Sequence, residues 1–191
     1  KSEPFGALAD SVLAAAVEAK ASDAESLLAA SADGKAVQEL LDDANATIGE
    51  KIEVKRVARI EAPVVSAYLH KTSPDLPAQI GVLLGTEGGD DQVGRDVAMH
   101  IAAFSPNVLT RDEIAEETVA NERRIAEETA KEEGKPEAAM PKIIEGRVNG
   151  FFKENVLLDQ PFAKDAKKSV GKVLEEAGAS ATQFARFRVG S

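Results

Sequence analysis

Two residue types are missing from the chain altogether, cysteine and tryptophan. The lack of cysteine excludes disulfides, thiolate metal sites and thiol catalysis, and it fits a reducing cytosol. Aromatic residues as a whole make up only 4% of the 191 residues. The core must therefore be built mainly from Ala, Val, Leu and Ile.

Positive charge and long apolar runs are also scarce. The 23 Lys and Arg residues stand against 33 Asp and Glu, for a formal net charge of −10. An acidic surface repels phosphate, so we expect no direct nucleic-acid partner. No apolar run approaches the ~20 residues of a membrane span, and no signal peptide is visible. We therefore expect a cytoplasmic protein without a membrane partner.

The first part of the chain combines helical patterns with a strand pattern. Apolar residues recur at helical spacing over 4–19 and 37–48, and Gly49 suits the left-handed conformation that ends a helix. Between them, SDAE at 22–25 predicts a capping box. Over 52–61 the apolar period changes to two, which predicts a strand.

The middle of the chain predicts an antiparallel strand pair and then a helix. The strands are expected near 64–70 and 80–86, joined by a long loop. The helix that follows contains His100 and should end before Pro106, because the residue before a proline avoids the helical region. Thr110, in TRDE, opens a second predicted capping box.

Residues 114–154 predict an antiparallel helical hairpin. The pattern is helical and dense in charge, and it is interrupted by Gly134 and Pro136, which suit a helix end and a helix start. Pro141 should kink the second arm or delay its start. After a polar loop, a short helix over about 168–177 and a last strand close the chain.

The sequence offers little catalytic chemistry. SVGKV at 169–173 lacks the first glycine and the following Ser/Thr of a phosphate loop, and neither a dinucleotide fingerprint nor a His-Glu-x-x-His pattern occurs. The glutamates of the 114–133 arm are typical of a solvated helix face. The chain's two histidines are separated by thirty residues without ligand spacing. We expect no catalytic residue, no metal site and no cofactor.

The two histidines call for different interpretations. His100 lies on or beside the apolar stripe of its helix, where a histidine is usually a core residue hydrogen-bonded through a ring nitrogen. His70 ends a strand at the mouth of a proline-containing loop, where binding residues concentrate. A solvated turn histidine is an equally good interpretation of His70.

Eight short motifs occur in an order that resembles bacterial elongation factor Ts, a family of nucleotide exchange factors for elongation factor Tu. The motifs are IGEKIEVKRV, SAYLH, IGVL, AMHIAA, EGR, LLDQPF, SVGKVLEEAG and RFRVG. Each motif alone is weak, but eight in order with compatible spacing are specific. The resemblance covers residues 1–191, and its details are actinobacterial in style.

The resemblance implies an α+β fold with two small antiparallel-sheet subdomains, packed helices and a projecting helical hairpin. The core N-subdomain would span 1–62, with 52–61 in its sheet. The core C-subdomain would combine 63–110 with 154–191, and the hairpin would span 111–153. A homodimer through this hairpin is one further expectation.

The resemblance also implies function and sites. It predicts an exchange factor that binds elongation factor Tu, releases GDP and is not an enzyme in the chemical sense. By motif match, Ile48, Gly49 and His70 would contact this partner. Ala163 and Lys164, which follow QPF, would do so too, although an apolar pair can occur there in the family.

The sequence departs from the family at its start. Family members begin with a small helical domain and a Thr-Asp-Phe-Val-Ala motif that disturbs the magnesium and phosphate site of Tu. The 191 residues contain neither, and the chain starts at Lys1 rather than Met. We therefore expect the native protein to start further upstream, and we expect this chain to bind Tu but to promote exchange poorly.

Two alternatives from other classes remain open at this point. One is a small hydrolase that uses His70 with a carboxylate such as Asp75, although no nucleophile can be named for it. The other is a purely structural interaction protein whose hairpin mediates assembly.

Overall fold

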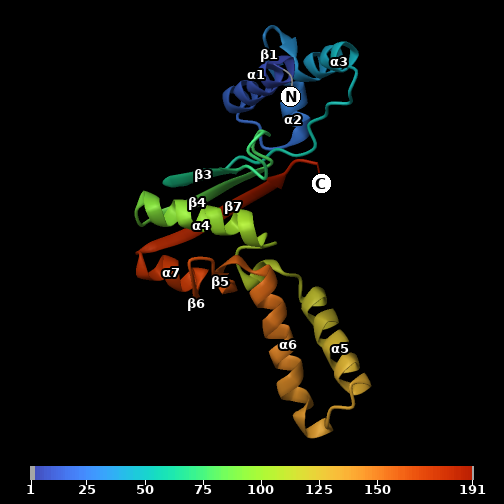
Figure 1. The fold of residues 1–191 in the computed structure, drawn as a ribbon, viewed down its shortest axis with the longest axis vertical. Coiled ribbons are helices and arrows are strands. Elements are labelled where there is room, and N and C mark those ends of the chain that lie inside the picture. The colour runs from blue at the N-terminus through green and yellow to red at the C-terminus, as the bar shows by residue number, and fades with distance from the viewer. Residues whose placement is uncertain (1–2, 191) are drawn as a thin grey trace. The chain divides into compact units, whose positions relative to one another are not determined.

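The computed structural model describes residues 3–190 and contains two compact units along the chain, shown in Figure 1. The first unit extends to Arg59 and the second begins at Ile60. Helices and small antiparallel sheets are mixed throughout, which confirms the predicted α+β class.

The first unit is a small helical body. It contains α1 (Glu3–Ala19), α2 (Ala24–Ala29) and α3 (Val37–Ile48), with the short strands β1 (Ser31–Ala32) and β2 (Lys35–Ala36) between the last two helices. Its core is aliphatic, as the scarcity of aromatics requires, and consists of Ala15, Ala21, Leu27, Ala32, Val37 and Leu41.

The capping box predicted at 22–25 is wrong by one residue. Asp23, in extended conformation, is the N-cap of α2, and its Oδ1 atom accepts a hydrogen bond from the Ser26 backbone N–H at 2.7 Å. The carboxylate thus serves the unpaired N–H of Ser26, one residue beyond the Glu25 N–H that the Ser22 hydroxyl was expected to serve.

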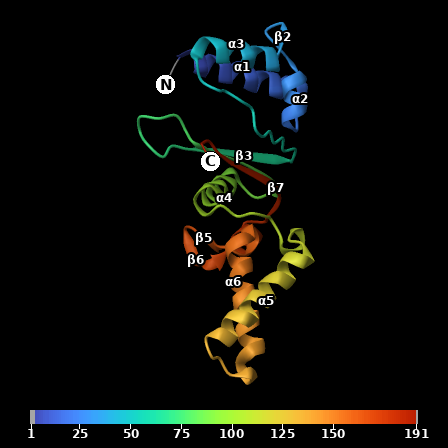
Figure 2. The same ribbon diagram turned by 90° about the vertical axis from the view of Figure 1, so that its right-hand side faces the viewer.

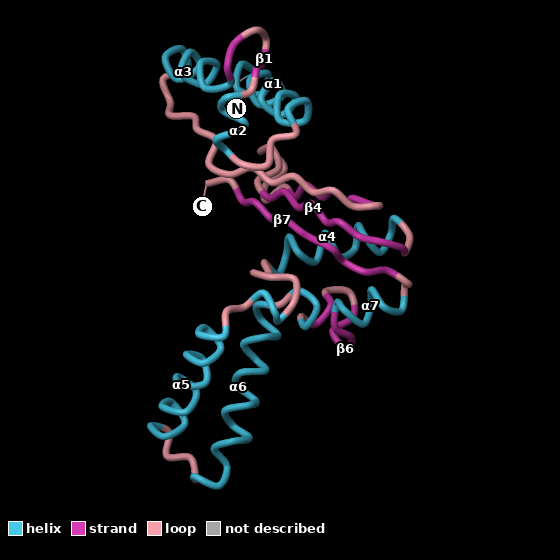
Figure 3. The backbone as a smooth tube through the Cα atoms, turned by 180° about the vertical axis from the view of Figure 1, so that it is seen from behind, coloured by secondary structure: helices cyan, strands magenta, loops and turns pink. Residues whose placement is uncertain are grey.

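The strand predicted over 52–61 is also wrong, because these residues form an irregular segment outside any described sheet; Figure 3 draws the connection after α3 as loop. Ile52 and Val54, which alternate with polar residues, pack against the first unit's core, and so does Val57, which breaks the alternation. The Asn45 side chain takes the place of a partner strand. It accepts from the Ile52 N–H at 2.6 Å and donates to the Ile52 carbonyl at 3.2 Å. Alternating burial at Ile52 and Val54 therefore arises here without a β-ladder.

The second unit is built on a three-stranded antiparallel sheet of order β3-β4-β7, formed by β3 (Val64–His70), β4 (Ile80–Gly88) and β7 (Ala179–Arg188). The predicted strand pair at 64–70 and 80–86 is thus present as β3 and β4, and the last strand, β7, pairs with the other edge of β4. Helix α4 (Asp91–Phe104) packs on β3 and β4. The core between helix and sheet includes Leu84, Val97 and Ile101, all fully buried.

A helical hairpin projects from the second unit, as Figures 1 and 2 show. It consists of α5 (Glu116–Glu132) and α6 (Met140–Asn155), which pack against each other. Gly134 has a φ of 73°, the left-handed conformation expected where the first arm ends. Pro141 lies in the first turn of α6, so it delays the helix start and does not kink it.

The base of the hairpin is joined to the body by two chain segments that run side by side. The Asn107 N–H donates to the Asn155 carbonyl at 2.9 Å, and the Leu157 N–H donates to the Val108 carbonyl at 2.9 Å. The short 3-10 helices η1 (Arg111–Glu113) and η3 (Leu157–Asp159) flank these bonds, and a third, η2 (Glu137–Ala139), precedes α6. In η1 the Glu113 carboxylate accepts from the Thr110 N–H at 2.8 Å, which agrees with the predicted second capping box.

The loop expected after the hairpin contains a small β-hairpin of its own. Strands β5 (Pro161–Phe162) and β6 (Asp165–Ser169) pair across a two-residue turn, Ala163–Lys164, and lead into α7 (Val170–Glu176). Among the described residues, the structure contains no helix that is both long and apolar enough to cross a membrane.

Candidate partner-binding cleft

A mainly apolar cleft of about 540 Å³ lies in the second unit between the sheet, α4 and the Ala163–Lys164 turn. Three of the five residues that the sequence assigned to partner contact line it, namely His70, Ala163 and Lys164. Residues far apart along the chain therefore meet at one site.

The strand register explains why the sheet contributes both basic and aromatic groups. His70 pairs with Ile80, and Ile80 pairs with Arg188. Directly opposite residues of antiparallel strands share a face, so these three side chains form one row across the sheet. Tyr68 and Arg186 lie in the next row on that face, on either side of Val82.

His70 is exposed at the rim of the cleft, at the end of β3. Its Nδ1 atom is 3.0 Å from the Tyr68 hydroxyl, and the two ring centroids are 5.9 Å apart. The His70 carbonyl accepts from the Gln79 N–H at 3.0 Å, which closes the intervening loop. The tyrosine thus orients an exposed imidazole that other molecules can reach.

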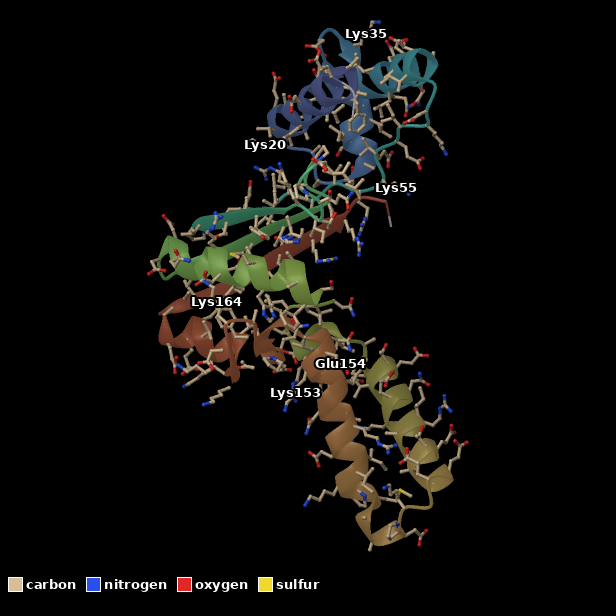
Figure 4. All side chains as sticks on the ribbon, in the orientation of Figure 1. Lys20, Lys35, Lys55, Lys153, Glu154 and Lys164 are labelled. Atoms are coloured by element: carbon tan, nitrogen blue, oxygen red, sulfur yellow. The ribbon has the colours of Figure 1, made fainter. Side chains whose placement is uncertain are left out.

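The Ala163–Lys164 turn forms another part of the rim. Lys164, labelled in Figure 4, reaches α4 with its ammonium group and contacts the Asp96 carboxylate at 2.6 Å. Asp96 retains only 17% of its side-chain exposure, whereas Lys164 retains 54%. The pair fixes the turn against the helix and leaves much of the lysine stem open.

His100 forms the inner wall of the cleft and is fully buried. Its Nε2 atom is 2.9 Å from Gln160 Oε1, and its Nδ1 atom accepts from the Ala163 backbone N–H at 3.0 Å. The ring stacks on Phe104 and Phe162 at centroid distances of 4.8 and 5.9 Å. This confirms His100 as a core residue bonded through its ring nitrogens.

Burial is also the main influence on the charge of His100. Loss of hydration lowers the pKa of the imidazole below its ordinary value, and the hydrogen bond with Gln160 opposes this in part. The ring is therefore neutral at physiological pH.

Arg186 extends from β7 beneath the end of α4. Its Nε and Nη2 atoms donate to the Ala102 carbonyl at 3.2 and 3.0 Å. A cation bonded to a carbonyl of the last helical turn satisfies an unpaired acceptor and favours the helix dipole. This bond links the helix that forms one wall to the strand that forms the floor.

Ile48 and Gly49, the other two residues assigned by motif, lie in the first unit. Ile48 ends α3 half-buried, and exposed Gly49 has a φ of 79° as the helix C-cap. The positive φ explains the glycine structurally, without any partner.

Sequence reasoning missed Tyr68, Asp96, Gln160 and Arg186 at this site. Tyr68 is two residues from His70 on the same strand, so period-two alternation could have placed both side chains on one face of the sheet. Asp96 is four residues before His100 on a helix. Gln160 is sixty residues from its histidine partner, and no local pattern could have joined them. Asp75, on which the hydrolase alternative depends, is not among the residues that line the cleft.

Fold and site together define an α+β protein with a helical hairpin and an apolar cleft that has basic side chains at its rim. The Elongation factor TS family matches the chain over residues 1–191. Elongation factor Ts of Kineococcus radiotolerans is 62% identical over 191 residues, and that of Pseudarthrobacter chlorophenolicus 58% identical over 194. That of Micrococcus luteus is 54% identical over 194 residues. Each match covers 100% of this chain and 70% of the relative.

The chain belongs to the elongation factor Ts family. The predicted resemblance is thereby confirmed over the full length of the sequence.

Proposed function

We propose that the chain is a guanine-nucleotide exchange factor of translation elongation, which binds elongation factor Tu and promotes the release of GDP. Family membership over all 191 residues is the observation that carries this function. Exchange of this kind needs no proton transfer and no metal held by the exchange factor, so the protein acts by binding rather than as an enzyme in the chemical sense.

The mechanism is differential binding. An exchange factor must stabilise nucleotide-free Tu more than GDP-bound Tu, because equal affinity for the two states would shift nothing. The coupling is reciprocal, so GDP weakens binding of the factor by the same ratio by which the factor weakens binding of GDP.

We assign partner contact to two places on the chain. One is the cleft with His70, Ala163 and Lys164 on its rim, where exposed polar groups surround an apolar floor as in many protein-binding sites. The other is the end of α3, with Ile48 and Gly49.

For domain organisation we propose a core N-subdomain over 1–62, a core C-subdomain over 63–110 and 154–191, and a hairpin over 111–153. The contact boundary between Arg59 and Ile60 supports the first division. Self-packing of α5 and α6 supports the last. The hairpin is also our candidate for homodimer formation, since Ile125 on α5 is 41% exposed. Sedimentation measures whether the unaltered chain forms a dimer, and the Ile125→Glu variant should be a monomer if the dimer forms through this side chain.

We further propose that the protein works in the cytoplasm through protein contacts alone. The formal charge of −10 disfavours direct contact with nucleic acid or with anionic membrane surfaces.

The experiment is to titrate the chain into Tu loaded with labelled GDP and to record both binding and nucleotide release. Binding that is stronger for nucleotide-free Tu is the expected result, with only a small acceleration of GDP release, because the 191 residues contain no Thr-Asp-Phe motif. His70→Ala should weaken binding, whereas Lys142→Ala, on an exposed position of α6, serves as the matched surface control. Failure of the unaltered chain to bind either form of Tu would overturn the proposal.

A further inference from the structure

A line of hydrogen bonds connects the rim of the cleft to the base of the hairpin through His100. The Ala163 N–H, in the rim turn, points at Nδ1 of the ring at 3.0 Å. Gln160 Oε1 lies 2.9 Å from the opposite nitrogen, Nε2. The Gln160 amide nitrogen in turn donates to the Glu154 carbonyl on α6 at 2.9 Å.

The direction of every bond in this line is fixed by its ends. A backbone N–H can only donate, so Nδ1 of His100 must carry a lone pair and the ring proton must sit on Nε2. That proton is donated to Gln160 Oε1, which leaves the amide nitrogen of Gln160 to donate to the Glu154 carbonyl. Both ring nitrogens are used, and Phe104 and Phe162 restrict rotation of the ring.

We propose that His100 and Gln160 are positioning residues for partner binding, which hold the Ala163–Lys164 turn in the orientation that the partner contacts. This inference rests on the proposed function, because it is the proposed function that makes the turn a contact for Tu. The bond to Ala163 acts on the backbone of the turn itself. The Lys164–Asp96 contact, at 2.6 Å, then requires the turn to be in place.

Protonation of His100 breaks this line at a defined point. An imidazolium carries N–H groups on both nitrogens, so Nδ1 would face the Ala163 N–H as a second donor. The charged or titratable groups that line the cleft with His100 are Asp96, Lys164, Arg186, Arg188, Tyr68 and His70. Asp96 is engaged by Lys164 and Arg186 donates to Ala102, so neither replaces the lost bond.

Two amide substitutions separate the two ring nitrogens. In His100→Asn the side-chain oxygen can occupy the Nδ1 position and accept from Ala163. In His100→Gln the side-chain nitrogen can occupy the Nε2 position and donate to Gln160, but nothing accepts from Ala163. Neither variant titrates, and both leave part of the ring volume empty, so each serves as the other's packing control.

The first readout is the amide hydrogen exchange of Ala163, which does not involve Tu. Loss of this partly buried hydrogen bond should speed exchange about tenfold in His100→Gln and much less in His100→Asn. The second readout is affinity for nucleotide-free Tu, which should fall about tenfold in His100→Gln and less than about threefold in His100→Asn.

The pH profile provides a readout that mere loss of packing would not move. Below about pH 6.5, as the pH approaches the lowered pKa of His100, the affinity of the unaltered chain should fall more than that of His100→Asn, because only the former loses its Nδ1 acceptor. His70 is present in both chains, so its contribution is common to the two profiles.

The outcomes are distinct. Equal Tu affinities and equal Ala163 exchange in the two variants would overturn the positioning role. If the unaltered chain does not bind Tu, the proposed function fails, yet Ala163 exchange still tests the bond line. If neither variant folds, nitrogen NMR of the unaltered chain follows each histidine separately, and Tu affinity that does not track the His100 titration overturns the inference.

Discussion

Arg111 makes two contacts at the base of the helical hairpin, and replacing it with Ala tests how firmly this base is held together. Its Nε atom lies 2.6 Å from Asp159 Oδ2, and its guanidinium carbon lies 4.5 Å from the centre of the Phe152 ring. The ion pair joins η1 to η3, and the ring contact joins η1 to α6.

The expected cost follows from the exposure of these groups. Arg111 is 50% exposed and Asp159 26% exposed, so solvent screens the ion pair and limits it to about 0.2–1 kcal/mol. The cation–π contact at a partly exposed site adds about 0.5–1 kcal/mol. Arg111→Ala should therefore lower the free energy of unfolding by about 1–2 kcal/mol.

Chemical denaturation of a small variant set measures each contribution. Asp159→Asn removes the ion pair, Phe152→Leu removes the ring contact, and Arg111→Lys keeps the charge but loses the planar guanidinium that stacks. A double-mutant cycle between Arg111→Ala and Phe152→Leu isolates the coupling. The Asp159→Asn effect should shrink at high salt. A loss below about 0.3 kcal/mol in Arg111→Ala would refute the reasoning, because both contacts would then contribute nothing measurable.

Three further predictions concern the hairpin and the histidines. Replacing residues 116–148 with a short Gly/Ser linker should leave a cooperatively folded body, because the buried side chains of the two arms lie outside the core cluster around Leu84; loss of cooperative unfolding by circular dichroism would contradict this. His70→Ala should weaken Tu binding with little change in melting, whereas His100→Ala should cost about 1–3 kcal/mol of stability through orphaned partners and a cavity; normal binding by folded His70→Ala with an early melt would reverse the assignment. Because the folded-state pKa of His100 is lowered, the unfolded chain takes up a proton first as pH falls below about 6.5, so stability should decrease from there toward the folded pKa. The decrease should be smaller in His100→Asn, and identical pH dependence in the two chains would show that His100 does not cause it.

Local patterns predicted the elements whose formation depends on neighbouring residues. The spacing of Val37 to Ile48 and the following Gly49 predicted α3 with its C-cap, and the strand pattern at 64–70 matches β3. In these cases, side-chain periodicity and backbone conformation at the boundary point to the same structure.

The errors arose where a local pattern admits more than one partner. Alternation over 52–61 is compatible with a β-ladder, but the backbone groups of Ile52 bond to the Asn45 side chain. The small hairpins β1–β2 and β5–β6 are too short for periodicity to indicate them. The cleft itself depends on contacts such as His100 with Gln160, which tertiary packing alone brings together.

Affinity for Tu at the cleft and coupling to nucleotide release are separate quantities, and substitutions of the rim residues can be classified by which of the two they change. A contact that is equally strong with GDP-bound and nucleotide-free Tu contributes affinity but no exchange, because only the difference between the two states drives release. His70 and Lys164 lie on a preformed rim held by Tyr68 and Asp96. Such a rim needs no rearrangement to dock, so we expect substitutions there to weaken both complexes by the same factor. The ratio of the two affinities should then stay constant while each falls. A rim substitution that changes this ratio would instead place the cleft among the elements that distinguish the nucleotide state of Tu.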